Sequence, residues 1–315
     1  MNILVFGAGG IGSVMGGFLT RMGHDVSLVG RAWHLDVVKK QGLVITGIWG
    51  DYRIKALECY ESVAAVPQKQ FDLILLTVKS YDTAAAVAGI KPRMSEKTTL
   101  IAFQNGLGNI EAVLAGGIAP ENFLAGRVIF GVDLTPGVAK VTVNADDVRI
   151  GGLPGVETRL GAFQAARIFS LAKVPTQPAS NILTYIWAKV IYNCALNGIC
   201  SLREMPYGKI LESAETREAM ERVVRECYAI GQKKGVTLDP PSAEEFIVLL
   251  KTKLIPSTAA HYPSMLQDLK RGRRTEISAL NGAIRRFGEE LGIPTPENKR
   301  VEEAVLAGEF LGIKQ

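Results

Sequence analysis

The stretch NILVFGAGGIG, residues 2–12, decides the class of fold of this chain. A short apolar strand pattern runs directly into the glycine spacing G-x-G-x-x-G, and a helical pattern over residues 11–23 follows. In such a strand–turn–helix the first glycine permits a tight turn, the second lets the backbone approach a pyrophosphate, and the third lets the helix pack closely on the strand. The start of the helix adds N–H donors and the positive end of its dipole. We therefore expect a dinucleotide-binding loop made of Gly7, Gly9, Gly10, Ile11 and Gly12.

The alternation of strand and helix continues through the first half of the chain. Strands separated by helices predict a parallel sheet of βαβ units, and residues 42–57 read as an inserted hairpin. After about residue 178 the strand patterns stop, and helical periodicity alternates with Gly/Pro breaks. We expect an α/β fold with an N-terminal Rossmann-type dinucleotide-binding domain (1–178) followed by an all-α C-terminal domain (179–315). The buried strands are expected at residues 2–6, 25–30, 71–78 and 98–104.

Length, charge and cysteine usage limit the classes of protein to consider. The 315 residues exceed the usual size of one core, and a net charge of +5 with mixed signs gives little support for nucleic-acid binding. The four cysteines show neither metal-ligand spacing nor a disulfide framework, which predicts no metal and a reducing, cytoplasmic location. Residues 182–202 are long enough to span a bilayer but carry polar residues near their middle, so we expect no membrane segment.

The residue that closes the second expected strand indicates the cofactor. An Asp or Glu there would bind the ribose 2′-hydroxyl of NAD, whereas this chain has Gly30-Arg31, and an arginine can pair with a 2′-phosphate. The alternative is a solvated surface arginine. We favour NADP as the cofactor of the domain at 1–178, with Lys79, after the strand ending in TVKS, as a further contact.

The stretch WAKVIYNCALN, residues 187–197, carries a polar stripe on an apolar helix. Lys189, Asn193 and Asn197 are four residues apart, and positions four apart on a helix are rotated by only about 40°. A solvent-facing stripe is the ordinary explanation. A stripe this narrow on so apolar a helix fits a substrate site better. Burial lowers the pKa of a lysine, which makes its ammonium group a competent proton donor near neutral pH.

Two further polar residues are candidates for the same site. Asn105, in the Gln104-Asn105-Gly106 segment after the strand at 98–104, falls where the carboxyl edge of a parallel sheet binds ligands, although Asn-Gly is also a common turn. A buried lysine requires a carboxylate nearby, and Glu276 is the candidate. By spacing alone, an ordinary helix carboxylate is the stronger explanation for Glu276.

Several of these motifs together resemble the ketopantoate reductase (2-dehydropantoate 2-reductase) family over nearly the whole chain. The shared motifs are GAGGIG, Arg31, the QNG at 104–106, WAKVIYNCALN, and SMLQDLKRGRRTEISALNG at 264–282. The last two are specific to the family, whereas the glycine loop alone is not. The resemblance implies NADPH-dependent reduction of 2-ketopantoate to pantoate on the pathway to pantothenate and coenzyme A.

The resemblance also implies roles for individual residues. Lys189 matches the catalytic lysine of the family, and Glu276 matches a glutamate that contacts the substrate. Ser264 matches a serine that helps to hold the substrate carboxylate. Asn105, Asn193 and Asn197 match substrate-binding asparagines, Asn105 also lying near the nicotinamide. The implied cofactor positions are Gly7, Gly9, Gly12, Arg31 and Lys79.

One departure from the family leaves the substrate open. Tyr207 stands where some members have another substrate-contacting asparagine. A related NADP-dependent 2-keto acid reductase or a β-hydroxyacid dehydrogenase is therefore an alternative. A non-enzymatic NADPH-binding sensor is another, which would not require the lysine and amides on the apolar helix. The apolar faces of the C-terminal helices would permit a homodimer.

Overall fold

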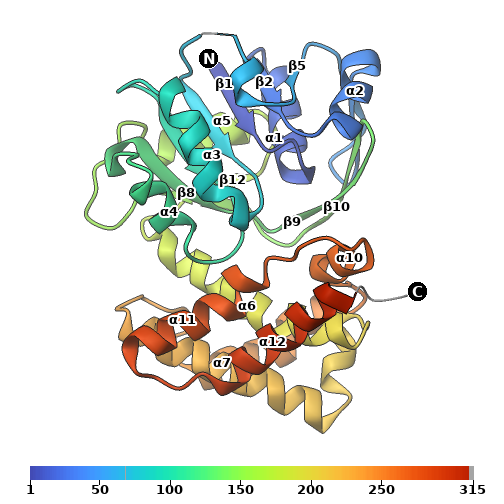
Figure 1. Cartoon of the computed structure of the whole chain (residues 1–315), viewed down its shortest axis with the longest axis vertical. Helices are drawn as coiled ribbons and strands as arrows, with labels where there is room; N and C mark the ends of the chain where they lie inside the picture. Colours follow the sequence, from blue (N-terminus) through green and yellow to red (C-terminus); the bar gives the residue numbers. More distant parts are fainter. Residues whose placement is uncertain (68, 312–315) are drawn as a thin grey trace. The chain divides into compact units, whose positions relative to one another are not determined.

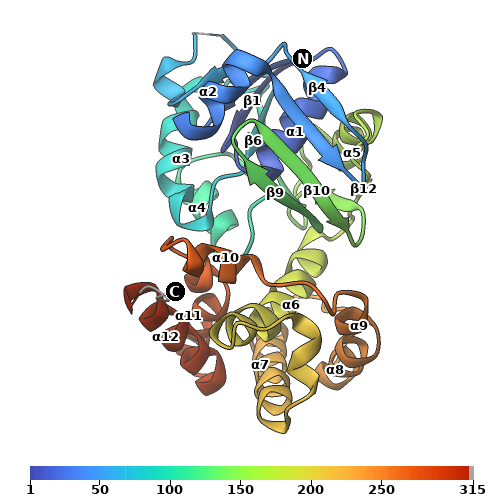
Figure 2. The ribbon, with the colours of Figure 1, turned by 90° about the vertical axis from the view of Figure 1, so that its right-hand side faces the viewer.

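The structure is a computed structural model that describes residues 1–67 and 69–311. The chain divides into two compact units (Figures 1 and 2). The first comprises residues 1–104 and 109–182, and the second comprises residues 105–108 and the chain from Leu183 onward.

An eight-stranded sheet forms the centre of the first unit. Six of its strands are parallel, and the two at one edge, β11 and β12, run in the opposite direction. β6 and β7 are buried at every position, which agrees with their sequences LILL and TLIA, apolar at every position except Thr99. The expected parallel sheet is confirmed. In order across the sheet, the strands are β12 (Thr176–Pro178), β11 (Val148–Gly151), β8 (Phe123–Arg127), β7 (Thr99–Ala102), β6 (Leu73–Leu76), β1 (Asn2–Phe6), β2 (Asp25–Val29) and β5 (Glu58–Tyr60).

A second, four-stranded sheet belongs to the same unit. The expected hairpin at 42–57 is confirmed, because β3 and β4 pair antiparallel with Leu43 opposite Ile54. β9 and β10 form another antiparallel pair, and β10 joins β3 in parallel. We had not predicted this joining of two hairpins, since nothing local in either segment encodes it. The order is β4 (Tyr52–Ile54), β3 (Leu43–Gly47), β10 (Val138–Asn144) and β9 (Phe130–Thr135).

Helix α1 packs against both sheets, and two adjacent glycines allow it. A Cβ at Gly16 would lie 2.7 Å from Leu28 Cδ2 of the large sheet, and one at Gly17 would lie 2.8 Å from Ile45 Cδ1 of the small sheet. Glycine at both positions therefore lets the backbone of α1 approach two layers at once. The helices of the first unit are α1 (Gly10–Arg21), α2 (Ala32–Gln41), α3 (Thr83–Ile90), α4 (Asn109–Ala115) and α5 (Ala162–Leu171).

The second unit contains helices and no strand within its described residues, as expected. Its core forms around the long helix α6, and Gly198 of α6 permits close packing on α12, because a Cβ there would lie 2.3 Å from Val301 Cγ1. Two short turns lie between helices, η5 (Tyr207–Leu211) and η7 (Ile277–Ala279), whereas η6 (Leu250–Leu254) is a π-helical segment continuous with the helices on both sides. The helices are α6 (Ile182–Leu202), α7 (Ala214–Lys233), α8 (Ala243–Leu249), α9 (Ile255–Ser257), α10 (Ser264–Lys270), α11 (Asn281–Leu291) and α12 (Pro296–Leu311). No helix in the described parts of the chain is long and apolar enough to cross a membrane.

A buried histidine links α2, α1 and the β9–β10 turn. His34 is 1% exposed, its Nδ1 accepts a hydrogen bond from the Gly137 N–H at 3.1 Å, and its Nε2 lies 3.0 Å from Ser13 Oγ. Because Nδ1 accepts, the proton of the neutral ring is on Nε2, which donates to the serine. Burial lowers the pKa of His34 below its usual value, although the Thr135 carbonyl opposes this effect.

This histidine predicts a component of pH-dependent stability. The unfolded chain takes up a proton at position 34 near pH 6.5, whereas the folded protein does so only at lower pH, so the free energy of unfolding falls as the pH drops through this range. We expect the stability of His34→Gln to change less between pH 7.5 and pH 5.5, measured by urea unfolding. Equal pH dependence in the two proteins would contradict the assignment.

Candidate functional site

Gly7, Gly9 and Gly12 of the loop after β1 differ in what a side chain at each position would contact. Gly7 has a φ of +119°, and a Cβ there would lie 2.6 Å from the backbone of Thr77 and Val78. A Cβ at Gly12 would lie 2.2 Å from the Gly7 carbonyl oxygen. At Gly9, by contrast, a Cβ would meet nothing within 4 Å. Gly7 and Gly12 are therefore required by close contacts with the protein's own backbone, and Gly9 leaves open space where a ligand can approach the backbone.

The first turn of α1 is suited to an anion. The helix begins at Gly10, its N-cap residue Gly9 makes no side-chain capping bond, and the first turn contains no acidic residue. The N–H groups of the first turn, which include those of Ile11 and Gly12, have no partners within a helix. They are thus donors for a phosphate, and the helix dipole favours the negative charge.

Arg31 follows the strand end that contacts this loop. The Val29 carbonyl accepts hydrogen bonds from the N–H groups of Gly7 at 2.9 Å and Ala8 at 2.8 Å. A Cβ at Gly30 would lie 2.6 Å from Ala8 Cβ, so glycine is required there as well. Arg31 itself is the exposed N-cap residue of α2. Its position is open to a phosphate, and neither position 30 nor position 31 carries a carboxylate that would bind a ribose hydroxyl.

Lys79 follows the strand on the other side of β1. Thr77, two residues before it, donates from Oγ1 to the Gly7 carbonyl at 2.8 Å. β6, β1 and β2 are neighbours in the sheet, so the segments containing Lys79, the glycine loop and Arg31 follow three adjacent parallel strands. Our sequence reasoning missed Thr77, although it lies in the TVKS segment, and a hydroxyl at a strand end could have indicated a bond to the loop.

A lysine, an amide and a carboxylate form a hydrogen-bonded group in the second unit. Lys189 Nζ on α6 donates to Asn105 Oδ1 at 2.6 Å, and Asn105 Nδ2 donates to Glu276 Oε2 at a longer 3.4 Å. Lys189 is half-buried, and Glu276 is 9% exposed. Glu276, the carboxylate expected near the lysine, is linked to it through Asn105, whose amide uses both of its ends to connect the two charged groups.

The position of Asn105 depends on the glycine after it. Gly106 has a φ of +84°, and a Cβ there would lie 2.5 Å from the Ala279 carbonyl oxygen. The Leu107 N–H donates to that same oxygen at 2.8 Å. The loop therefore rests on η7, the turn that begins immediately after Glu276.

The two asparagines of the α6 stripe do not face solvent. Asn193 is 9% exposed and Asn197 is 6% exposed, which excludes the solvent-facing explanation for these positions. Asn197 Oδ1 accepts a hydrogen bond from Tyr207 Oη at 2.6 Å. Sequence reasoning singled out Tyr207 only as a departure from a family pattern and did not predict this bond.

Ser264 is a predicted site residue that no hydrogen bond joins to the group of Lys189, Asn105 and Glu276. It is the exposed first residue of α10, and no hydrogen bond connects it with Lys189, Asn105 or Glu276. No group of three or more potential metal ligands occurs within residues 1–67 and 69–311.

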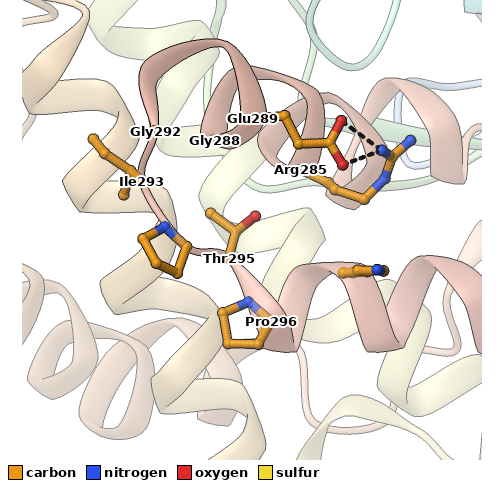
Figure 3. Close-up of a pocket in the computed structure, with 9 residues that line it drawn as sticks. Arg285, Gly288, Glu289, Gly292, Ile293, Thr295 and Pro296 are labelled. Atoms are coloured by element: carbon orange, nitrogen blue, oxygen red, sulfur yellow. Dashed lines mark hydrogen bonds and ion pairs between the residues drawn. The ribbon is translucent and has the colours of Figure 1, made fainter.

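A surface hollow elsewhere in the second unit contains none of the predicted site residues. It has a volume of about 380 Å³ and lies where α11 leads into α12 (Figure 3). Arg285 beside it is paired with Glu289 at 2.7 Å, so its charge is already compensated. The hollow is lined by Arg285, Gly288, Glu289, Gly292, Ile293, Pro294, Thr295, Pro296 and Lys299.

Comparisons with known proteins match both parts of the chain. Residues 3–155 match the model for ketopantoate reductase PanE/ApbA, and residues 181–309 match its C-terminal model. A 2-dehydropantoate 2-reductase from Aquifex aeolicus is 38% identical, with 100% of this chain and 99% of that protein covered. A PanE/ApbA family ketopantoate reductase from Ralstonia eutropha JMP134 has a TM-score of 0.88 at 30% identity, with both chains fully covered. D-mandelate dehydrogenase, in a ternary structure with NADH and anilino(oxo)acetate, has a TM-score of 0.89 at 27% identity, with 99% of each chain covered.

The contact at Gly106 predicts a difference between two similar glycines. Gly108 has a φ of +90°, close to that of Gly106, but a Cβ there would meet nothing within 4 Å. We expect Gly108→Ala to lower the free energy of unfolding by about 1–2 kcal/mol through backbone strain alone. Gly106→Ala adds the clash with Ala279, and we expect it to cost about 2 kcal/mol more. Urea unfolding measures both variants, and equal losses would show that the approach to Ala279 is unimportant.

Proposed function

We propose that this chain, which belongs to the ketopantoate reductase PanE/ApbA family, is an NADPH-dependent 2-dehydropantoate 2-reductase. It reduces the C2 ketone of 2-dehydropantoate to give (R)-pantoate, which serves pantothenate and coenzyme A synthesis. The observation that carries the proposal is the bond of 2.6 Å from Lys189 to Asn105, with Glu276 bonded to the same amide. A lysine ammonium held in place by an amide can stabilise and protonate the oxygen of a ketone as it is reduced.

The residues of the first unit fit the nicotinamide cofactor. The open space at Gly9, the uncapped first turn of α1 and the arginine after β2 match a pyrophosphate and a 2′-phosphate. When bound, NADPH supplies a hydride to C2 of the keto acid. The residues that would hold it are Gly7, Gly9, Gly10, Ile11, Gly12, Arg31, Lys79 and Asn105.

Lys189 acts on the ketone oxygen. Its ammonium donates a hydrogen bond to that oxygen, stabilises the negative charge that develops there as C2 is reduced, and transfers a proton to give the alcohol. Asn105 accepts from Nζ and so limits the positions that the ammonium can adopt. Glu276 contacts the substrate, and its carboxylate accepts a hydrogen bond from the NH₂ group of Asn105.

Amides and a hydroxyl recognise the rest of the substrate. Asn193 and Asn197 lie one and two helical turns from Lys189, and neutral amides can donate to a carboxylate or hydroxyl oxygen without a fixed charge. Ser264 is assigned to the substrate carboxylate from its sequence motif. Asn105 is the third asparagine that we assign to substrate binding.

The remaining assignments follow from the family and the composition. We assign residues 1–178 to an NADP-binding domain and residues 179–315 to a helical substrate and catalytic domain. The enzyme belongs in the cytoplasm, where its four buried cysteines stay reduced. A homodimer is the assembly to test first.

A second candidate function is reduction of a different 2-keto acid. It is favoured by the likeness to D-mandelate dehydrogenase, whose structure holds NADH and anilino(oxo)acetate. A sensor that binds NADPH without turnover is disfavoured, because it has no need of a lysine and two buried amides on one helical stripe.

The assay that separates these functions follows NADPH absorbance with 2-dehydropantoate and a panel of other 2-keto acids. We expect oxidation that depends on the added keto acid, with the highest kcat/KM for 2-dehydropantoate. A higher kcat/KM for another member of the panel would replace the proposed substrate. Tight NADPH binding without oxidation would indicate the sensor.

Replacement of Lys189 tests the proton donor. Lys189→Ala removes the group that stabilises and protonates the developing alkoxide, and we expect kcat to fall by roughly 10²- to 10⁴-fold. The control is Lys233→Ala, which removes an exposed lysine from α7 and should leave kcat unchanged. Turnover of Lys189→Ala within a few-fold of the parent would rule out the acid role.

Replacement of Arg31 tests the choice of cofactor. Loss of a charge-assisted contact to the 2′-phosphate should lower kcat/KM for NADPH by roughly 10- to 100-fold and leave that for NADH nearly unchanged. Lys40→Ala, at the other end of α2, makes the same change in charge and serves as the control. Unchanged selectivity in Arg31→Ala would show that Arg31 does not read the 2′-phosphate.

A further inference from the structure

Tyr207 is a buried phenol bonded to the polar stripe of α6. It is the first residue of η5, it is 4% exposed, and its Oη donates to Asn197 Oδ1 at 2.6 Å. The stripe residue farthest along α6 from Lys189 is therefore bonded to a side chain from outside the helix.

Contacts other than this bond hold Tyr207 in place. Its N–H donates to the His261 carbonyl at 3.0 Å, and the N–H of Gly208 donates to the Ala259 carbonyl at 2.9 Å. Its ring packs edge-on against Tyr192, with centroids 5.7 Å apart and planes at 89°. The hydroxyl can thus be removed while the ring and backbone keep their packing.

The bond to Tyr207 determines which end of the Asn197 amide is left for a ligand. An asparagine side chain has one acceptor oxygen and one NH₂ donor group. The oxygen is occupied by the phenol, while the NH₂ group forms no hydrogen bond with the described residues. Burial, with smaller contributions from Tyr192 and Cys200, raises the pKa of the Tyr207 phenol well above its usual value, so the hydroxyl stays protonated and can donate to Asn197 Oδ1 as the geometry shows. Asn197 is left with a donor, which matches the carboxylate and ketone oxygens of a 2-keto acid.

We propose that Tyr207 is a positioning residue for substrate recognition, which fixes Asn197 with its NH₂ group directed at an oxygen of the 2-keto acid. The inference rests on the proposed function, in which the α6 stripe binds the substrate. Without the hydroxyl, the amide can rotate and present its carbonyl, which repels a carboxylate or ketone oxygen. The effect is on binding rather than on proton transfer, because Tyr207 bonds to Asn197 and not to Lys189.

The test is Tyr207→Phe in steady-state kinetics. We expect the KM for the keto acid to rise roughly tenfold, equivalent to the loss of about 1.4 kcal/mol of binding, while kcat stays within about threefold and the KM for NADPH is unchanged. A residue that only supports the fold would alter kcat and the KM for NADPH as well. An unchanged KM for the keto acid overturns the proposal.

Tyr192→Phe is the matched control. It removes a hydroxyl from the adjacent ring, whose partner is Thr258 Oγ1 at 2.9 Å and not Asn197. We expect its KM for the keto acid to stay near that of the parent. An increase equal to that of Tyr207→Phe would show that loss of either hydroxyl weakens substrate binding, and would overturn the proposal.

Asn197→Asp provides an independent variant. Aspartate keeps an acceptor for Tyr207, loses the NH₂ donor and has two identical ends. We expect Asn197→Asp to raise the KM for the keto acid, and Tyr207→Phe to add no further increase in that background. Should Tyr207→Phe fail to fold, an unchanged KM in Asn197→Asp alone overturns the proposal.

The parent enzyme is first assayed with the panel of 2-keto acids. If it reduces another keto acid in preference to 2-dehydropantoate, the proposed substrate is wrong, and the Tyr207 variants are measured with the preferred acid. If it reduces none of them, both the proposed function and the role of Tyr207 are overturned.

Discussion

The candidate catalytic group depends on one close backbone contact, between Gly106 and the carbonyl of Ala279. A side chain at position 106 would place a Cβ 2.5 Å from that oxygen, and the φ of +84° also favours glycine. The contact rests the loop on η7, and Glu276 immediately precedes η7. In this way Asn105 meets Lys189 and Glu276, which are 84 and 171 residues away in the sequence.

The same group shows how charge is accommodated at the edge of an apolar core. Removing the partner of a buried lysine or glutamate lowers the free energy of unfolding by much more than the intact pair contributes to it. Here the Asn105 carbonyl accepts from the ammonium and its NH₂ donates to the carboxylate, so each charge has a partner of suitable polarity. Asn197 follows the same principle at the far end of the stripe, with Tyr207 as its partner. The first unit differs, because Gly9 has no side chain to cover the N–H groups at the start of α1, which can therefore face a phosphate.

Local patterns in the sequence predicted much of this arrangement. The glycine loop and the strand alternation are short-range features, and the four-residue spacing of Lys189, Asn193 and Asn197 follows from the helical repeat alone. The sequence could not predict the parallel pairing of β10 with β3, because it joins segments more than ninety residues apart. The bond from Asn105 to Glu276 was missed for the same reason, because it joins residues 171 apart. The bond from Tyr207 to Asn197 joins residues only 10 apart, but it depends on how the chain turns between α6 and η5, which no local pattern specifies. Ser264 was assigned by its motif, and its exposed position on α10 adds no support of its own.

The central claim is that Lys189 serves the ketone oxygen of a keto acid bound along the α6 stripe. A crystal structure of the protein with NADP⁺ and a non-reducible analogue of 2-dehydropantoate tests it most directly. We expect the oxygen replacing the ketone to lie about 3 Å from Lys189 Nζ, with the Asn197 NH₂ group donating to the ligand. An analogue bound away from α6, for example in the hollow between α11 and α12, with Lys189 making no contact to it, would show that Lys189 does not serve the ketone.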